Sequence, residues 1–161
     1  MTNLFCVRAE FGTYTKHFVD GGFVAIGWMA NTDLSAVKSR DELYPLYKAE
    51  HPDDTSNIVI GQQVGQVARF LLEIAAGDYV ITPAADTEWL HYGQAVPDPS
   101  YIYASGDDGC PYRHRRRVAW APQRLKRGDF SVPFQNTIRS SLTVFAVSQR
   151  DEFLAAIGRA D

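Results

Sequence analysis

The stretch from Gly77 to Val96, GDYVITPAADTEWLHYGQAV, restricts the possible folds more than any other part of the chain. It begins with Gly-Asp, a turn signal, directly after an amphipathic helical segment. Residues 79–82 are aromatic or β-branched and lie between a glycine and Pro83, as expected for a strand. Residues 89–96 predict a second strand after a polar loop. The stretch is therefore predicted to form a β-hairpin.

Two side chains of the second strand are of functional interest. Because side chains alternate between the faces of a strand, Trp89 and His91 share one face while Leu90 and Tyr92 share the other. A tryptophan and a histidine beside Gly93 suggest a platform on which a flat ligand stacks. The alternative is an edge-strand tryptophan half covered by its neighbours. The pattern alone leaves both interpretations open.

The rest of the chain predicts strands and short helices. Strands are expected at residues 3–9, 23–28, 101–103, 112–120 and 143–147, and helices at residues 11–20, 40–50, 57–76, 133–142 and 151–160. Strands outnumber long helices, and the chain contains no glycine motif of the dinucleotide-binding or P-loop type. The pattern indicates an α+β fold, in which a strongly curved mixed sheet or pseudo-barrel has helices packed outside it.

Length and composition favour one cytoplasmic domain without a cofactor. A chain of 161 residues fits a single domain, with residues 148–161 as a C-terminal helical tail or a linker to a missing effector. The two cysteines, Cys6 and Cys110, indicate neither a disulfide framework nor a zinc site. There is no signal peptide and no apolar run of membrane-spanning length, so we expect a cytoplasmic protein with no membrane partner, metal or cofactor.

Positive charge is concentrated in one segment. Seven of the sixteen Lys and Arg residues fall between Arg113 and Arg127, where there is no acid, although the whole chain carries a net charge of −3. An acidic chain with one basic segment favours a local anionic partner. The alternative is a solvated arginine strand that prevents edge-to-edge aggregation. For phosphate contacts the candidates are Arg113, Arg115, Arg117, Arg124, Lys126 and Arg127.

Six short motifs, taken in order, resemble a known family. They are VRAEFG, GFVAIGW, FLLEIAAGDYVIT, LHYGQAV, RHRRRVAW and SSLTVFAV. This series resembles the N-terminal domain that precedes the nuclease domain in Mrr-type modification-dependent restriction endonuclease proteins. That domain is similar to the EVE and YTH domains of the PUA-like superfamily. The resemblance extends from Leu4 to about Val147, and the order of the motifs carries its specificity.

The resemblance implies a PUA-like pseudo-barrel that holds a modified base in an aromatic pocket. Trp28 matches the pocket wall that follows the second strand in such domains, and Trp89 is the best match for a second wall. Looser matches near the same pocket are Phe11, Tyr14, Asn31 and Tyr92. Candidates for a polar contact that distinguishes the modified base are Asn31, Asp33, Gln66 and Glu88.

We therefore expect a non-catalytic domain that binds double-stranded DNA and recognises a methylated or hydroxymethylated base flipped from the helix. It would target a nuclease domain or subunit, either as an excised domain or as a short protein acting with a partner. Flipping costs a few kcal/mol, stacking returns roughly 1–3 kcal/mol per base, and phosphate contacts supply further affinity. One alternative is an RNA-binding or nucleotide-sensing module on the same fold. An enzyme is a third, although no histidine or cysteine lies in a recognised catalytic motif.

Overall fold

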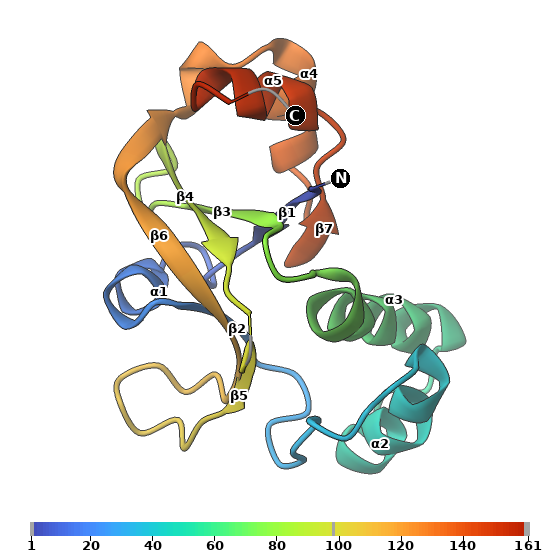
Figure 1. The fold of residues 1–161 in the computed structure, drawn as a ribbon. Helices are drawn as coiled ribbons and strands as arrows, with labels where there is room; N and C mark the ends of the chain where they lie inside the picture. Colours follow the sequence, from blue (N-terminus) through green and yellow to red (C-terminus); the bar gives the residue numbers. More distant parts are fainter. Residues whose placement is uncertain (1, 98, 160–161) are drawn as a thin grey trace.

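One mixed, strongly curled sheet organises the chain (Figure 1), and the computed structural model describes residues 2–97 and 99–159 of it. Its strands are β1 (Leu4–Val7), β2 (Phe23–Ile26), β3 (Tyr79–Pro83), β4 (Trp89–Ala95), β5 (Tyr101–Tyr103), β6 (His114–Lys126) and β7 (Val144–Ala146). Their order is β2-β6-β4-β3-β1-β7, with β5 paired to β6. Strands β1 and β3 are parallel, and the other pairs are antiparallel.

Short helices cover the sheet on two sides. They are α1 (Thr15–Gly21), α2 (Leu43–Glu50), α3 (Asn57–Ala68), α4 (Val132–Ile138) and α5 (Arg150–Ala156), with 3₁₀ turns at Arg40–Glu42 and Arg127–Asp129. A π-helical turn, η2 (Arg69–Glu73), continues α3. Ser56 and Ser131 cap α3 and α4 by accepting a hydrogen bond from a backbone N–H of the first turn. Helices α2 and α3 form a hairpin on one side, whereas α4 and α5 lie together at another end (Figure 1).

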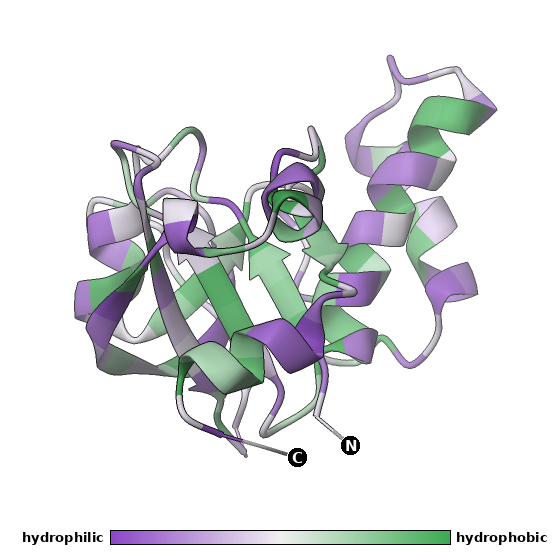
Figure 2. Cartoon of the chain, turned by 90° about the horizontal axis from the view of Figure 1, so that it is seen from above, coloured by the Kyte–Doolittle hydropathy of each residue, from purple (hydrophilic) through white to green (hydrophobic). Residues whose placement is uncertain are grey.

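Strands β1, β2 and β3 are buried along their whole length, as expected for strands covered on both faces. In β1, Phe5 and Val7 enter a core cluster that includes residues of α1, α2 and α3, while Leu4 and Cys6 enter a second cluster with residues of α4 and α5. In Figure 2 these strands are green, as expected for apolar segments, and the helices carry purple polar faces. The sheet thus separates two apolar layers, with helices on each side.

Strand β6 is longer than the sequence predicted and crosses both halves of the sheet. Its first part pairs with β2 and β5, and its second part pairs with β4. The register shifts between His91, which faces Arg124, and Gly93, which faces Trp120, so a bulge falls at residues 121–123. This bulge accommodates Pro122, which cannot donate a ladder hydrogen bond. The strand therefore continues past the point at which a proline suggested its end.

Arg116 connects the sheet to the end of the α3–η2 segment. Its side chain is 4% exposed. Its guanidinium donates to the carbonyl oxygens of Phe70 and Ile74, each at 2.7 Å, and to Ser100 Oγ at 2.8 Å. These carbonyls end a helical segment and would otherwise lack donors. Burial lowers the pKa of Arg116.

The predicted α+β class with a curved mixed sheet and flanking helices is confirmed. The hairpin at residues 77–96 is present as β3 and β4, with Leu90 buried in the second cluster and Tyr92 packed against that cluster. Phe153 and Leu154 of α5 are buried there too, so residues 150–156 form part of the packed fold. Residues 160 and 161 lie outside the described residues. Among the helices described, none combines the length and apolar character needed to cross a bilayer.

Candidate functional site

A cavity of about 330 Å³ lies beside Trp28, at the end of β2. We call it the Trp28 cavity; its lining residues are Gly27, Trp28, Tyr112 and Thr143. Its volume lies near the lower end of the roughly 300–1,000 Å³ found for small-molecule sites. A Cβ at Gly27 would lie 2.7 Å from Tyr112 Cε1, so a glycine is needed for this ring to approach the backbone. Two aromatic side chains therefore line one open cavity.

The loop that carries Trp28 is fixed by the residue that follows it. Met29 is fully buried and has φ +59°, an unusual conformation for a residue with a side chain. Its carbonyl oxygen lies 2.6 Å from His114 Nε2, and its N–H donates to His51 Nε2 at 3.4 Å. Side chains from β6 and from the end of α2 thus hold the two peptide groups on either side of the Met29 Cα.

Further contacts anchor residues 30–32. The Ala30 carbonyl accepts hydrogen bonds from Tyr103 Oη at 2.6 Å and from Arg113 Nη1 at 3.0 Å. The Glu50 carboxylate accepts from the Asn31 N–H at 2.9 Å and from Thr32 Oγ1 at 2.7 Å. Arg113 is therefore a loop anchor, and its guanidinium also lies over the Tyr103 ring, 4.3 Å from its centroid. The backbone that positions Trp28 is fixed without help from a ligand.

The imidazole of His114 holds this loop, and it does so in the neutral state. Its Nε2 faces a carbonyl oxygen and must carry the hydrogen, so Nδ1 accepts from Tyr101 Oη at 2.7 Å. The ring is completely buried, and burial lowers its pKa. Tyr101 Oη in turn accepts from the Leu34 N–H at 3.2 Å, and burial raises the pKa of Tyr101 to about 12.

A second tyrosine and a carboxylate adjoin the Trp28 cavity. The rings of Tyr14 and Tyr112 meet edge to face, with centroids 5.0 Å apart. The Glu10 carboxylate lies near both tyrosines, and its negative charge raises the pKa of each. Burial raises the pKa of Tyr112, and this carboxylate raises it further, so Tyr112 stays a neutral hydrogen-bond donor. The cavity therefore has an aromatic lining with a polar, acidic edge.

The backbone beside Trp28 is held by Gln66, which sequence reasoning treated as a possible contact to the ligand. Its Oε1 is an acceptor for the N–H groups of Thr143 and Val144, at 2.8 and 3.1 Å, and the side chain is 4% exposed. Gln66 thus fixes the position of Thr143. Asp33 accepts from the Ser35 N–H within its own loop.

Trp89 lies elsewhere on the sheet and is not among the residues that line the Trp28 cavity. It begins β4 opposite Lys126, at the C-terminal end of β6, whereas Tyr112 comes just before the N-terminal end of β6. The Arg124 guanidinium covers the Trp89 ring, 4.7 Å from its centroid. The second ring beside Trp28 is therefore Tyr112, which was predicted to begin the strand at residues 112–120 and was not among the candidate pocket residues; in the structure it lies just before β6.

The looser matches are dispersed. Tyr14 adjoins Tyr112, as described above, whereas Tyr92 packs against Phe153, with ring centroids 5.8 Å apart. The Asn31 side chain is exposed. Phe11 is 96% exposed and stands out from the surface rather than lining the cavity.

Arg115 requires a correction, because its side chain lies inside the protein. It is 7% exposed and donates to both carboxylate oxygens of Asp108, at 2.6 and 2.8 Å. Its guanidinium also lies 4.2 Å from the Phe23 ring centroid. This hydrogen-bonded arginine holds the pKa of Asp108 well below its usual range. A guanidinium neutralised in this way has no free donor face for a phosphate.

Other members of the predicted phosphate-binding set are accessible. Arg117, Arg124 and Lys126 are exposed, and Arg127 is half-buried. Alternation along residues 112–120, at the start of β6, predicted at least one basic face, with Arg113, Arg115 and Arg117 on the same side. Instead, His114, Arg115 and Arg116 are buried in succession because neighbouring elements cover both faces at that end. Free positive charge is therefore shifted toward the C-terminal half of the strand.

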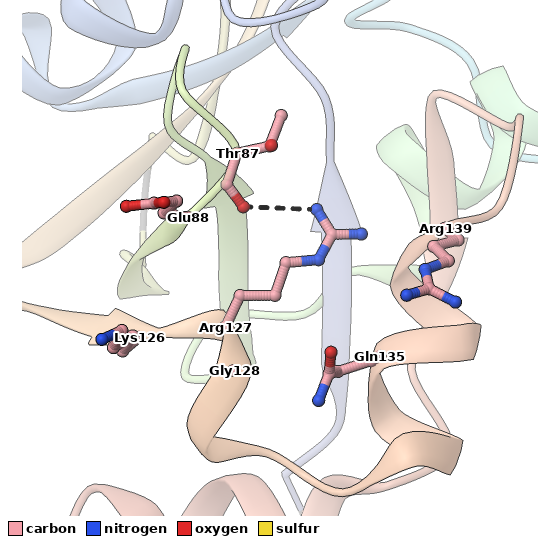
Figure 3. Close-up of a pocket in the computed structure, with 7 residues that line it drawn as sticks. All are labelled: Thr87, Glu88, Lys126, Arg127, Gly128, Gln135 and Arg139. Carbon is pink, nitrogen blue, oxygen red and sulfur yellow. Dashed lines mark hydrogen bonds between the residues drawn. The ribbon is translucent and has the colours of Figure 1, made fainter.

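A larger cavity, about 470 Å³, lies at this C-terminal end (Figure 3). We call it the basic cavity; its lining residues are Thr87, Glu88, Lys126, Arg127, Gly128, Gln135 and Arg139. Figure 3 shows Arg127 reaching the Thr87 carbonyl, at 3.5 Å, with Arg139 across from it on the α4 side. Burial lowers the pKa of Arg127, and the nearby charges of Arg8 and Arg139 lower it further. Converging positive charges of this kind favour an anionic ligand.

Arg139 was missed by sequence reasoning because it is separated from the basic segment and only the fold brings it near Arg127. In the described part of the chain, no group of three or more His, Cys, Asp or Glu side chains is arranged to hold a metal ion. Among the described residues, one cavity is therefore lined by aromatic rings and the other by converging positive charges.

Comparison with known proteins places the chain in a family. The model of a family described as a domain of unknown function, DUF8426, matches residues 8–148. The chain belongs to this DUF8426 family. Among curated proteins, none matches it by sequence.

Comparison of structures relates the DUF8426 fold to a YTH domain. The similar structure is the YTH domain of the Zygosaccharomyces rouxii MRB1 protein, solved in complex with N6-methyladenosine RNA. The TM-score is 0.51 at 9% sequence identity, and the match covers 99% of this chain and 88% of that one. At this identity the likeness concerns the fold, and it confirms the predicted YTH-like architecture. Association with a restriction endonuclease stays a prediction.

Proposed function

We propose that this DUF8426 domain is a non-catalytic module that binds nucleic acid and holds one modified base in the Trp28 cavity. The observation that carries the proposal is the pair of aromatic side chains, Trp28 and Tyr112, that line one open cavity on a rigid loop. Double-stranded DNA with a methylated or hydroxymethylated base is the expected ligand. The expected downstream effector is a restriction nuclease in a separate domain or subunit.

Stacking and hydrogen bonding have different tasks in this proposal. Contacts with aromatic side chains contribute roughly 1–3 kcal/mol per base, which offsets a flipping cost of a few kcal/mol. One extra methyl group adds only about 0.8 kcal/mol by burial. Discrimination therefore needs a polar contact as well. The candidate for this contact is the hydroxyl of Tyr112, which lines the cavity and stays protonated because burial and the nearby Glu10 carboxylate raise its pKa.

The phosphates would follow a path toward the basic cavity. Thr143 lines the Trp28 cavity and Arg139 lines the basic cavity, and they are four residues apart in sequence. Four residues span at most about 14 Å between Cα atoms. A few nucleotides on either side of a bound base can therefore reach Arg139 and Arg127. Arg117, Arg124 and Lys126 would add contacts along exposed β6.

The proposal is tested by measuring binding to duplexes that differ in one base. Matched oligonucleotides carry N6-methyladenine, 5-methylcytosine, 5-hydroxymethylcytosine or the unmodified base, and affinity is measured by fluorescence anisotropy. We expect tighter binding to one modified duplex, and we expect Trp28→Ala and Tyr112→Ala to abolish that preference while the circular dichroism spectrum is retained. Trp89→Ala is the matched control, because it removes an indole outside the cavity and should leave the preference intact. Equal affinity of the unaltered protein for all duplexes would refute the proposal.

A second candidate is an RNA-binding or nucleotide-sensing module that uses the same cavity. It is favoured by the similar YTH domain, whose structure holds N6-methyladenosine RNA. A single-stranded RNA needs no duplex opening before a base enters the cavity. Preference for single-stranded RNA over both forms of DNA, or competition by free mononucleotides with little duplex binding, would support this candidate.

A further inference from the structure

Phe11 is an aromatic side chain held out in solvent by an unfavourable backbone. Its side chain is 96% exposed. Glu10, Phe11 and Gly12 have φ values of +51°, +54° and +86°, so three successive residues lie in the left-handed region. Only the glycine adopts that region without steric cost. Strained residues of this kind concentrate at functional sites.

The turn that presents Phe11 is firmly attached. A Cβ on Gly12 would lie 2.4 Å from the Ala85 Cα, so the turn packs directly on the loop between β3 and β4. The Thr13 N–H donates to the Glu10 carbonyl at 2.9 Å, and the Tyr14 N–H donates to the Ala9 carbonyl at 3.0 Å. Thr15 Oγ1 then donates to the Pro83 carbonyl at 2.9 Å. Phe11 therefore projects from a closed, well-packed turn.

This turn also adjoins the Trp28 cavity. Glu10, the residue before Phe11, lies close enough to Tyr112 for its charge to raise the pKa of that tyrosine. Tyr14, three residues after Phe11, contacts the ring of Tyr112, which lines the cavity, with centroids 5.0 Å apart. Nearly all of the surface of Phe11 faces water, so packing within the described part of the chain does not account for a phenylalanine at this position.

We propose that Phe11 is a wedge that enters the base stack of a DNA duplex at the position vacated by the flipped base. This inference rests on the proposed function. Extruding a base leaves a gap in the stack, and proteins that distort DNA insert apolar side chains such as phenylalanine between base steps. Because the turn is already fixed, only the side chain of Phe11, and not its backbone, has to be ordered when the ring enters the stack. Such a wedge acts only on a duplex, because a single strand has no partner strand to hold the gap open.

The test compares one modified strand in two forms, as a duplex and alone. Phe11→Ala is expected to weaken duplex binding by about 5- to 140-fold, the range for loss of one aromatic stacking contact. It should change single-strand binding less than twofold. Phe11→Trp should retain duplex binding. Ile58→Ala is the matched control, because Ile58 is another large apolar side chain, 85% exposed, on a different element.

Phe11→Gly separates strain from function. It suits the positive φ and removes the ring, so it should raise the melting temperature and still weaken duplex binding as much as Phe11→Ala. Unchanged duplex binding in Phe11→Ala, or equal losses with duplex and single strand, would overturn the wedge. Trp28→Ala in the same assay decides the proposed function separately. If Trp28→Ala abolishes modification preference while Phe11→Ala has no effect, only the wedge fails. If the protein prefers no modified base, the proposed function fails, and the wedge with it.

Discussion

Replacing Arg116 with Met should destabilise the fold strongly even though the side chain belongs to an arginine-rich strand. The change keeps an unbranched apolar side chain of moderate length and removes every donor. The three donated bonds at 2.7–2.8 Å, to Phe70, Ile74 and Ser100, are lost. Hydrogen bonds to charged groups are worth about 1.5–3 kcal/mol each, so the two carbonyl contacts alone account for about 3–6 kcal/mol.

Part of this loss is offset because the variant no longer buries a charge. Burial lowers the pKa of Arg116, and the nearby acid that opposes this effect is Asp78. Removing the guanidinium therefore also removes a desolvation cost, and we expect a net loss of about 2–5 kcal/mol in the free energy of unfolding. For a domain of this size, such a loss lowers the melting temperature by about 4–20 °C.

The assay is urea and thermal unfolding followed by circular dichroism, with Arg117→Met as the control. Arg117 is adjacent in sequence but exposed, and its substitution should change stability by no more than about 0.5 kcal/mol. The reasoning would be refuted by an Arg116→Met variant as stable as the unaltered protein, or by equal losses in the two variants. Either result would mean that burial does not separate structural arginines from surface ones on β6.

Two further predictions concern titration and salt. Burial lowers the pKa of His114 in the folded state. Below the usual histidine pKa near 6.5, this residue therefore binds a proton more readily in the unfolded chain than in the folded one. The free energy of unfolding should therefore fall as pH is lowered from 7.5 to 5, and it should fall less steeply in the His114→Gln variant. Urea titrations at each pH measure this free energy. Equal pH dependence of the unfolding free energy in the two proteins would contradict this role of His114. His91, whose pKa burial also lowers, contributes equally to both curves. Replacing Arg117, Arg124 and Lys126 together with Ala should reduce the slope of log K against log salt by about 0.9 for each lost duplex phosphate contact, and an unchanged slope would exclude these residues from the interface.

The fold was largely predictable because strands buried on both faces have continuous apolar sequences, which are recognisable in the chain. In β1, Phe5 and Val7 lie on one face and Leu4 and Cys6 lie on the other, as the alternation of side chains along a strand predicts. The extension of β6 was not predictable, because a bulge absorbs Pro122 and polar residues continue the ladder. Propensity alone ends a strand at such a proline.

The candidate site was predictable only in part, because its members meet through tertiary structure. The position of Trp28 at the end of a buried strand was visible in the sequence. Its partner Tyr112 comes from a loop distant in sequence, and its approach depends on the absence of a Cβ at Gly27. The charge of the arginine segment was visible too, but not the carboxylate of Asp108 that neutralises Arg115.

The anchoring of residues 29–32 by His51 and Glu50 connects the α2–α3 hairpin to Trp28. Neither side chain is among the residues that line the Trp28 cavity, yet each fixes the main chain that sets the angle of the indole. Under the proposed function, substitutions at Glu50 or His51 would alter base selectivity from outside the Trp28 cavity, by changing the orientation of the indole. A directed-evolution library aimed at a new base should include this hairpin alongside the wall residues.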